Sequence, residues 1–121
     1  MTDAGETDPS VRFLAHRVEA FCSDRDWGQF HNTKDLAISL ALEAAEVLEL
    51  TQWKGISELE SNQELRVRLA EELSDVLYWV LVLASRHGID LADAFERKMV
   101  ENERKYPANK ARGSSAKYTE L

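Results

Sequence analysis

The segment EELSDVLYWVLVLA, residues 71–84, constrains the fold of this chain more than any other. From Val76 to Ala84 every residue is apolar or aromatic, which covers all sides of a helix for more than two turns. A helix that is apolar all round has to be buried on all sides. Yet Glu72 and Asp75 lie three residues apart at its start, and therefore on one helical face. Carboxylates beside a buried helix must be paired, protonated or bound to a metal.

Helical spacing of apolar residues recurs along most of the remaining chain, and no alternation typical of strands is present. We expect helices over about 9–24, 34–53, 63–86 and 91–105. The fold class that this pattern predicts is all-α, with four main helices forming an oligomeric helical bundle. Three neighbouring helices of one chain can cover the apolar segment only partly, so we expect helix 63–86 to hold an obligate oligomer together.

Capping residues predict where these helices begin and end. Asp8 followed by Pro9 is typical of a helix start, and Thr33 and Asp90 are candidate N-caps for later helices. Gly88 suits the C-terminus of helix 63–86. In terms of domains, we expect a disordered tail over 1–8, a helical domain over 9–106 and an irregular tail over 107–121.

Composition narrows the classes of partner. The chain has 121 residues, with 22 acidic and 15 basic side chains and a net charge of −7, which argues against a duplex nucleic-acid binder. The apolar run is too short to cross a bilayer, and the polar first ten residues do not resemble a secretory signal. Cys22 is the single cysteine, so no intramolecular disulfide can form. We therefore expect a cytoplasmic protein without a nucleic-acid or membrane partner.

The acidic pair at the start of the apolar segment has a counterpart upstream. Glu43 and Glu46 are also three residues apart, and no lysine or arginine lies between residues 34 and 54 to pair with them. Two such pairs on two apolar helices could converge as four oxygen ligands, which suit Mg²⁺ or Mn²⁺. The alternative is that both pairs line a solvated face, as acidic residues commonly do. None of the three histidines follows a glutamate at i+3, so the di-iron Glu-x-x-His motif is absent.

Five segments of the chain resemble one known family. They are DWGQFHNTKDL (26–36), EAAEVLELTQWK (43–54), EELSDVLYW (71–79), KMVENERKYP (98–107) and ARGSSAKYTEL (111–121). Together they resemble the MazG-like all-α nucleoside triphosphate pyrophosphohydrolases, and within them the dCTP pyrophosphatase branch. The acidic motifs alone are moderately specific, whereas their combination with the other segments is highly specific.

The resemblance implies a function and a set of site residues. It implies that Glu43, Glu46, Glu72 and Asp75 bind Mg²⁺; the oxygen donors would also suit Mn²⁺. Residues that it implies for substrate binding are Trp27, Gly28, Gln29, Phe30, His31, Trp53, Trp79, Asn102, Arg104, Lys105 and Tyr106. Such an enzyme is a homotetramer that cleaves a nucleoside triphosphate to the monophosphate and pyrophosphate, as in nucleotide-pool sanitation. The general base stays open between Glu46 and Glu49.

One position departs from the pattern of that branch. Trp79 stands where a tyrosine is expected, so the resemblance leaves strict dCTP specificity open and extends the expected substrates to modified pyrimidine nucleotides. Two alternatives also remain open. One is a catalytically silent helical oligomer that serves as a binding or regulatory module, which the intact set of four carboxylates disfavours. The other is a dUTPase-like enzyme of the same superfamily.

Overall fold

The computed structural model describes residues 9–121, and these residues form helices and no strands. Their elements are α2 (Val11–Asp24), η1 (Trp27–Phe30), α3 (Thr33–Glu49), α4 (Ile56–Glu60), α5 (Gln63–Arg86), α6 (Leu91–Lys105), α7 (Ala108–Ala111) and η2 (Tyr118–Glu120), where η denotes a 3-10 helix. The predicted all-α class with four main helices is thereby confirmed. The described chain divides into two compact units, one ending at Ile89 and one spanning Asp90–Leu121.

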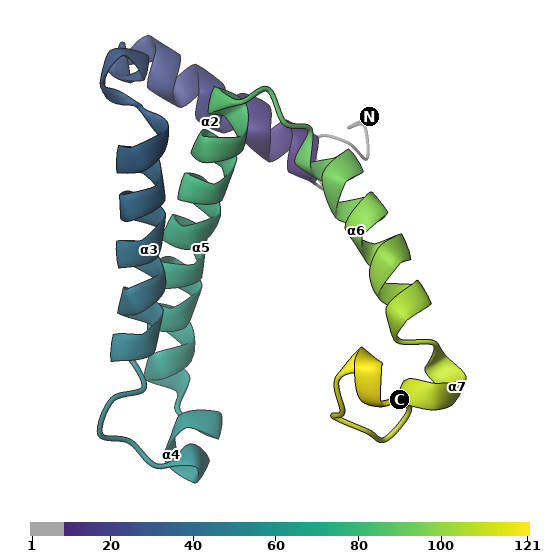
Figure 1. The fold of residues 1–121 in the computed structure, drawn as a ribbon. Helices are drawn as coiled ribbons and strands as arrows, with labels where there is room; N and C mark the ends of the chain where they lie inside the picture. Colours follow the sequence, from purple (N-terminus) through teal and green to yellow (C-terminus); the bar gives the residue numbers. More distant parts are fainter. Residues whose placement is uncertain (1–8) are drawn as a thin grey trace, which may run out of the picture. The chain divides into compact units, whose positions relative to one another are not determined.

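The first unit is built on α3 and α5, which run antiparallel and side by side (Figure 1). Helix α2 packs against the C-terminal half of α5, where the Ser85 hydroxyl donates to the Glu19 carboxylate at 3.1 Å. The buried apolar side chains of the described chain are few: Leu36, Leu50, Leu65, Leu81, Val82 and Ala84. Leu36 and Leu50 are buried near the two ends of α3.

Helix α5 begins and ends as the sequence predicts. Asn62 accepts a hydrogen bond from the Leu65 amide at 3.0 Å and so caps its N-terminus. At the other end Gly88 has a φ of +62°, and the Ile89 amide donates to the Ala84 carbonyl at 2.9 Å. This is the hydrogen-bond pattern of a Schellman motif, which requires the left-handed conformation that glycine adopts without strain.

The start of α3 lies within one residue of the prediction, but its predicted N-cap and its predicted C-terminal end are wrong. Helix α3 is capped by Asn32, which accepts from the Asp35 amide at 2.9 Å, whereas Thr33 bonds through its hydroxyl to His87 Nε2 at 2.8 Å. The same helix ends at Glu49 rather than near residue 53, and in the turn that follows Trp53 adopts a left-handed φ of +65°.

The start of α2 also differs from the prediction. Ser10 caps this helix by accepting from the Phe13 amide at 3.2 Å, so Pro9 precedes the helix instead of opening it. The predicted cap Asp8 and the predicted disordered tail 1–8 lie outside the described residues. The short helix α4 was not expected from the sequence at all; Gly55 precedes it.

The second unit contains α6, α7 and η2. Asp90 caps α6 by accepting from the amides of Ala92 and Asp93, as predicted. The stretch after Pro107 was expected to be irregular and contains the single-turn helix α7 and the η2 turn. The Tyr118 ring of η2 packs edge-on against Tyr106 at 5.9 Å. The domain limits 9–106 and 107–121 stay a prediction.

Candidate metal centre

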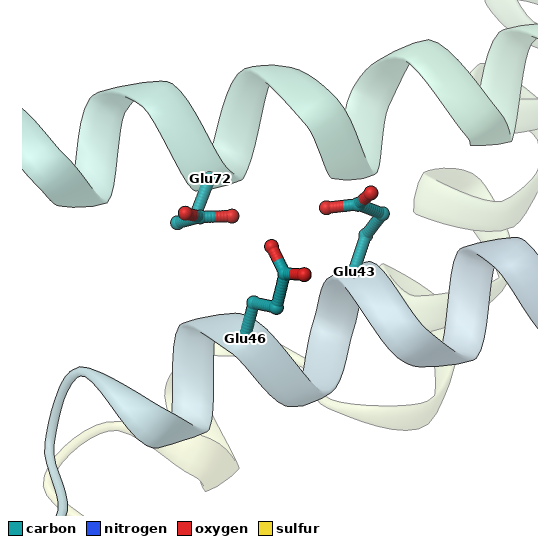
Figure 2. Close-up of side chains that lie close together, drawn as sticks. All are labelled: Glu43, Glu46 and Glu72. Carbon is teal, nitrogen blue, oxygen red and sulfur yellow. The ribbon is translucent and has the colours of Figure 1, made fainter.

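Three glutamates converge between the two central helices. Glu43 and Glu46 project from α3 and Glu72 from α5, and their side chains point toward one another (Figure 2). One carboxylate oxygen of each lies within 4.8 Å of those of the other two. The pair on α3 shares a face because its members are three residues apart. The antiparallel packing of α3 and α5 then brings Glu72 opposite that face.

Their close approach raises the pKa of two of these three carboxyl groups. Glu43 Oε2 and Glu72 Oε2 are buried and have no hydrogen-bond partner among the described residues. Hydrogen bonding with Glu46, followed by loss of water and the charges of neighbouring acids, raises the pKa of Glu72 to about 7. Burial and then the charge of Glu46 raise the pKa of Glu43 as well. The cluster therefore requires protons or a cation to compensate its charge.

The donor set fits a small hard cation. Mg²⁺ binds oxygen at about 2.0–2.1 Å, so neighbouring oxygens in its octahedron lie about 3 Å apart. The three glutamate oxygens lie within 4.8 Å of one another, and rotation of their flexible side chains can shorten these distances to the spacing that the cation needs. Asp75 lies one turn beyond Glu72 on α5, outside this group of three, although its charge raises the pKa of both Glu43 and Glu72. Three of the four predicted ligands are thus brought together, and the fourth is near them.

The aromatic loop of the sequence prediction is η1 and the residue after it. Trp27 packs edge-on against a phenylalanine ring of α2 at 5.4 Å, and Phe30 is 66% exposed. The Gln29 amide donates to the Asp26 carboxylate at 2.9 Å, which stabilises the loop internally. At Gly28 an added Cβ would meet no atom within 4 Å, so space alone does not require glycine there.

His31 connects this loop with the central helices. Its ring lies edge-on to Trp79, 6.3 Å between centroids, and Trp79 stands on α5 about two turns beyond Glu72. Hydrogen bonding from the Trp79 side chain opposes the rise of the Glu43 pKa. An aromatic and imidazole surface therefore adjoins the carboxylate cluster on the side toward the C-terminal end of α5.

On the opposite side of the cluster lies a polar hollow of about 370 Å³. It is lined by Glu46, Glu49, Leu50, Gln52, Lys54, Arg68 and Glu72. Glu49, the second candidate for the general base, thus adjoins the cluster without belonging to its group of three. Arg68 was not singled out from the sequence; the available signal was its position four residues before Glu72, on the same helical face.

The remaining predicted substrate residues are Trp53 and four residues of the second unit. Trp53 is 98% exposed in the turn after α3. Asn102, Arg104, Lys105 and Tyr106 belong to the second unit. There the Tyr106 amide donates to the Asn102 carbonyl at 2.8 Å, and the Lys105 ammonium pairs with a glutamate of α6 at 3.1 Å.

Comparison with known proteins places the chain in a family. The MazG-like family model matches residues 38–121, which include all three glutamates of the cluster. The chain belongs to the MazG-like family. This MazG-like chain is 42% identical over 117 residues to dCTP pyrophosphatase 1 of Homo sapiens, covering 94% of the chain and 69% of that protein. It is 39% identical to dCTP pyrophosphatase 1 of Mus musculus, with the same coverage.

A solved crystal structure has a fold similar to that of this chain. The crystal structure of a pyrophosphatase from Archaeoglobus fulgidus superposes on this MazG-like chain with a TM-score of 0.67 and 39% sequence identity. The superposition covers 78% of this chain and 89% of that one. The all-helical fold is therefore shared with a solved pyrophosphatase structure. Among the described residues, no helix is long and apolar enough to cross a membrane.

Proposed function

We propose that this chain is a nucleoside triphosphate pyrophosphohydrolase, and that its preferred substrates are dCTP or modified pyrimidine deoxynucleotides. Membership of the MazG-like family and the similarity to dCTP pyrophosphatases support the reaction class. The observation that carries the proposal is the convergence of Glu43, Glu46 and Glu72, with two buried carboxylate oxygens that lack partners. Its cellular role is to clear such nucleotides from the pool.

Glu43, Glu46 and Glu72 would hold Mg²⁺, and Asp75, one turn further along α5, is the proposed fourth ligand. Mn²⁺ suits the same oxygen donors. When bound, the cation neutralises charge on the triphosphate and polarises its phosphoryl oxygens. Without a cation, a triphosphate and this group of acids would repel each other, which is why substrate binding and metal binding are coupled.

The reaction joins a water oxygen to the α-phosphorus and breaks the bond from that phosphorus to the oxygen bridging to the β-phosphate. The water proton passes to a carboxylate, and pyrophosphate leaves. Glu46 and Glu49 are the candidate acceptors. Glu49 is the better placed if Glu46 is used as a ligand, because Glu49 lines the hollow beside the cluster but stands outside the group of three.

Aromatic side chains next to the cluster are proposed to contact the nucleotide, and those toward the C-terminal end of α5 to bind its base. His31 and Trp79 are in contact with each other next to Glu43, and the rest of the loop from Trp27 to Phe30 adjoins them. Trp53 is fully exposed in a left-handed conformation, which costs about 1–2 kcal/mol for a residue other than glycine. Such strain on an exposed aromatic residue supports a binding role. For Asn102, Arg104, Lys105 and Tyr106 we propose phosphate contacts.

We further propose that the active protein is a homotetramer. Within one chain the apolar segment of α5 is incompletely covered, since Leu77 is 42% exposed and Leu73, one turn before it, is 50% exposed. Few side chains are buried in the described chain, which is a small core for its length. A second copy packed on α5 would complete the burial. Light scattering after size-exclusion chromatography gives the assembly mass; a monomer at micromolar concentration would contradict this.

The decisive experiment is pyrophosphate release from a panel of deoxynucleoside and nucleoside triphosphates, with and without Mg²⁺. We expect metal-dependent release that is strongest for a cytosine nucleotide and is lost in Glu72→Gln. Glu64→Gln on the same helix is the matched control and should retain activity. Preference for dUTP would identify the dUTPase-like alternative. If folded protein releases pyrophosphate from no nucleotide, the result favours the alternative of a catalytically silent binding module.

A further inference from the structure

The polar hollow beside the carboxylate cluster carries two basic side chains among its acids. Lys54 comes from the turn that follows α3, and Arg68 comes from α5, one helical turn before Glu72. Although Glu46, Glu49 and Glu72 line the same hollow, neither basic side chain forms an ion pair or hydrogen bond within the described chain. Two cations are thus presented beside the cluster, free to bind an anion from outside.

The order of charged and aromatic side chains along α5 is as informative as the charge of the hollow. Along α5, Arg68 lies about 6 Å before Glu72 and Trp79 about 10 Å after it, at 1.5 Å per residue. The cluster therefore stands between a cationic end and an aromatic end. A nucleoside triphosphate has the same order of groups, with its base at one end, its outer phosphates at the other and the α-phosphate between them.

We propose that Arg68 and Lys54 bind the β- and γ-phosphates of the substrate and hold pyrophosphate after cleavage. This inference rests on the proposed function and assigns an orientation to it. The triphosphate extends from the carboxylate cluster toward the N-terminal end of α5, and the base lies toward His31 and Trp79. The guanidinium of Arg68 suits bidentate binding of phosphate oxygens, and the ammonium of Lys54 adds a second positive charge. Both offset the repulsion between outer phosphates and the neighbouring glutamates.

The test measures separately how the enzyme binds its two products, pyrophosphate and the monophosphate. Cleavage of dCTP is measured in Mg²⁺ by monophosphate formation, and inhibition constants are determined for inorganic pyrophosphate and for dCMP. In Arg68→Gln the inhibition constant of pyrophosphate should rise about tenfold or more, the usual consequence of losing a hydrogen bond between charged groups. The constant for dCMP should stay within about twofold of wild type, because the monophosphate does not reach the hollow. Arg68→Lys should recover part of the loss.

A binding measurement complements the kinetics. Calorimetric titration with a dCTP analogue carrying a methylene bridge between the α- and β-phosphorus should give weaker binding in Arg68→Gln. Arg66→Gln is the matched control, since Arg66 lies on the same helix but does not line the hollow. Its constants should equal those of wild type. If Arg68→Gln melts at a much lower temperature than wild type, the same inhibition constants are measured for Lys54→Gln, which changes the turn after α3.

The outcomes are distinguishable. If wild type cleaves no nucleotide, the proposed function fails. If wild type is active but pyrophosphate inhibits Arg68→Gln and Lys54→Gln as strongly as wild type, the orientation alone is overturned. Equal weakening of pyrophosphate and dCMP would likewise overturn it, because the two residues would then support the site as a whole.

Discussion

Binding of Mg²⁺ to the carboxylate cluster is expected to release protons at pH 6 and almost none at pH 8. The cause is the raised pKa of Glu72, about 7, which arises mainly from its hydrogen bonding with Glu46 and from burial. A carboxyl group must lose its proton before it can bind the cation. Metal binding near or below this pKa therefore displaces a proton into the buffer.

The size of the effect follows from that pKa. With a value of about 7, Glu72 is about 0.9 protonated at pH 6 and about 0.1 protonated at pH 8, and the difference is released on binding. The pKa of Glu43 is also raised, so its release adds to that of Glu72. We therefore expect close to one proton per site at pH 6, or somewhat more.

Isothermal titration calorimetry measures this directly. Mg²⁺ is titrated into the protein at each pH in two buffers whose ionisation enthalpies differ, and the dependence of the observed enthalpy on the buffer gives the number of protons released. Glu64→Gln, which changes an acid of α5 outside the cluster, should give the wild-type number. A binding enthalpy at pH 6 that is the same in both buffers would refute the reasoning.

The same pKa predicts how metal-free protein responds to pH. The folded pKa of Glu72 lies above the unfolded value of 4.5, so between these values the folded state binds more protons than the unfolded state. The free energy of unfolding must then fall as pH rises from 4.5 to about 7, and this contribution is flat above that. Melting curves in EDTA from pH 5 to pH 8 should show the fall, and Glu72→Gln should reduce it. A wild-type melting temperature that rises through this range at constant oligomer mass would contradict the assignment.

Three further predictions concern ligand binding, the core and the backbone. Wild type should melt at a higher temperature in 5 mM MgCl₂ than in EDTA, since ligand at 100 times its dissociation constant stabilises by about 2.7 kcal/mol; equal melting temperatures would remove support for the metal centre. Leu36→Ala should lower the free energy of unfolding by about 2–5 kcal/mol in a denaturant titration, because Leu36 is only 1% exposed. Leu36→Met, which keeps most of the side-chain volume, should cost less than about 1.5 kcal/mol. Gly88→Ala should cost about 1–2 kcal/mol because its φ is +62°, and Gly28→Ala, at a position without positive φ or close neighbours, should cost less in the same titration.

Helix limits were predictable where a local signal determines them. The limits of α5 and α6 follow from the glycine at position 88 and the aspartate at position 90, which act through their own backbone or side chain. The end of α3 could not be predicted in this way. The apolar spacing continues past Glu49, whereas the chain enters a turn at Leu50 in which Trp53 adopts a left-handed conformation that the sequence does not favour.

The candidate site shows the same division between local and long-range determinants. Spacing alone predicts that Glu43 and Glu46 share a face, and likewise Glu72 and Asp75. It does not predict which member of the second pair joins the first, because that depends on the position of α3 along α5, which the packing of the two helices determines. A shift by one turn would bring Asp75 into the group in place of Glu72. Spacing likewise places Arg68 on the face of Glu72 but does not show that the turn after α3, which carries Lys54, lies beside it. Changes that move α3 along α5 are therefore expected to alter metal binding and phosphate binding together, even when every charged side chain is retained.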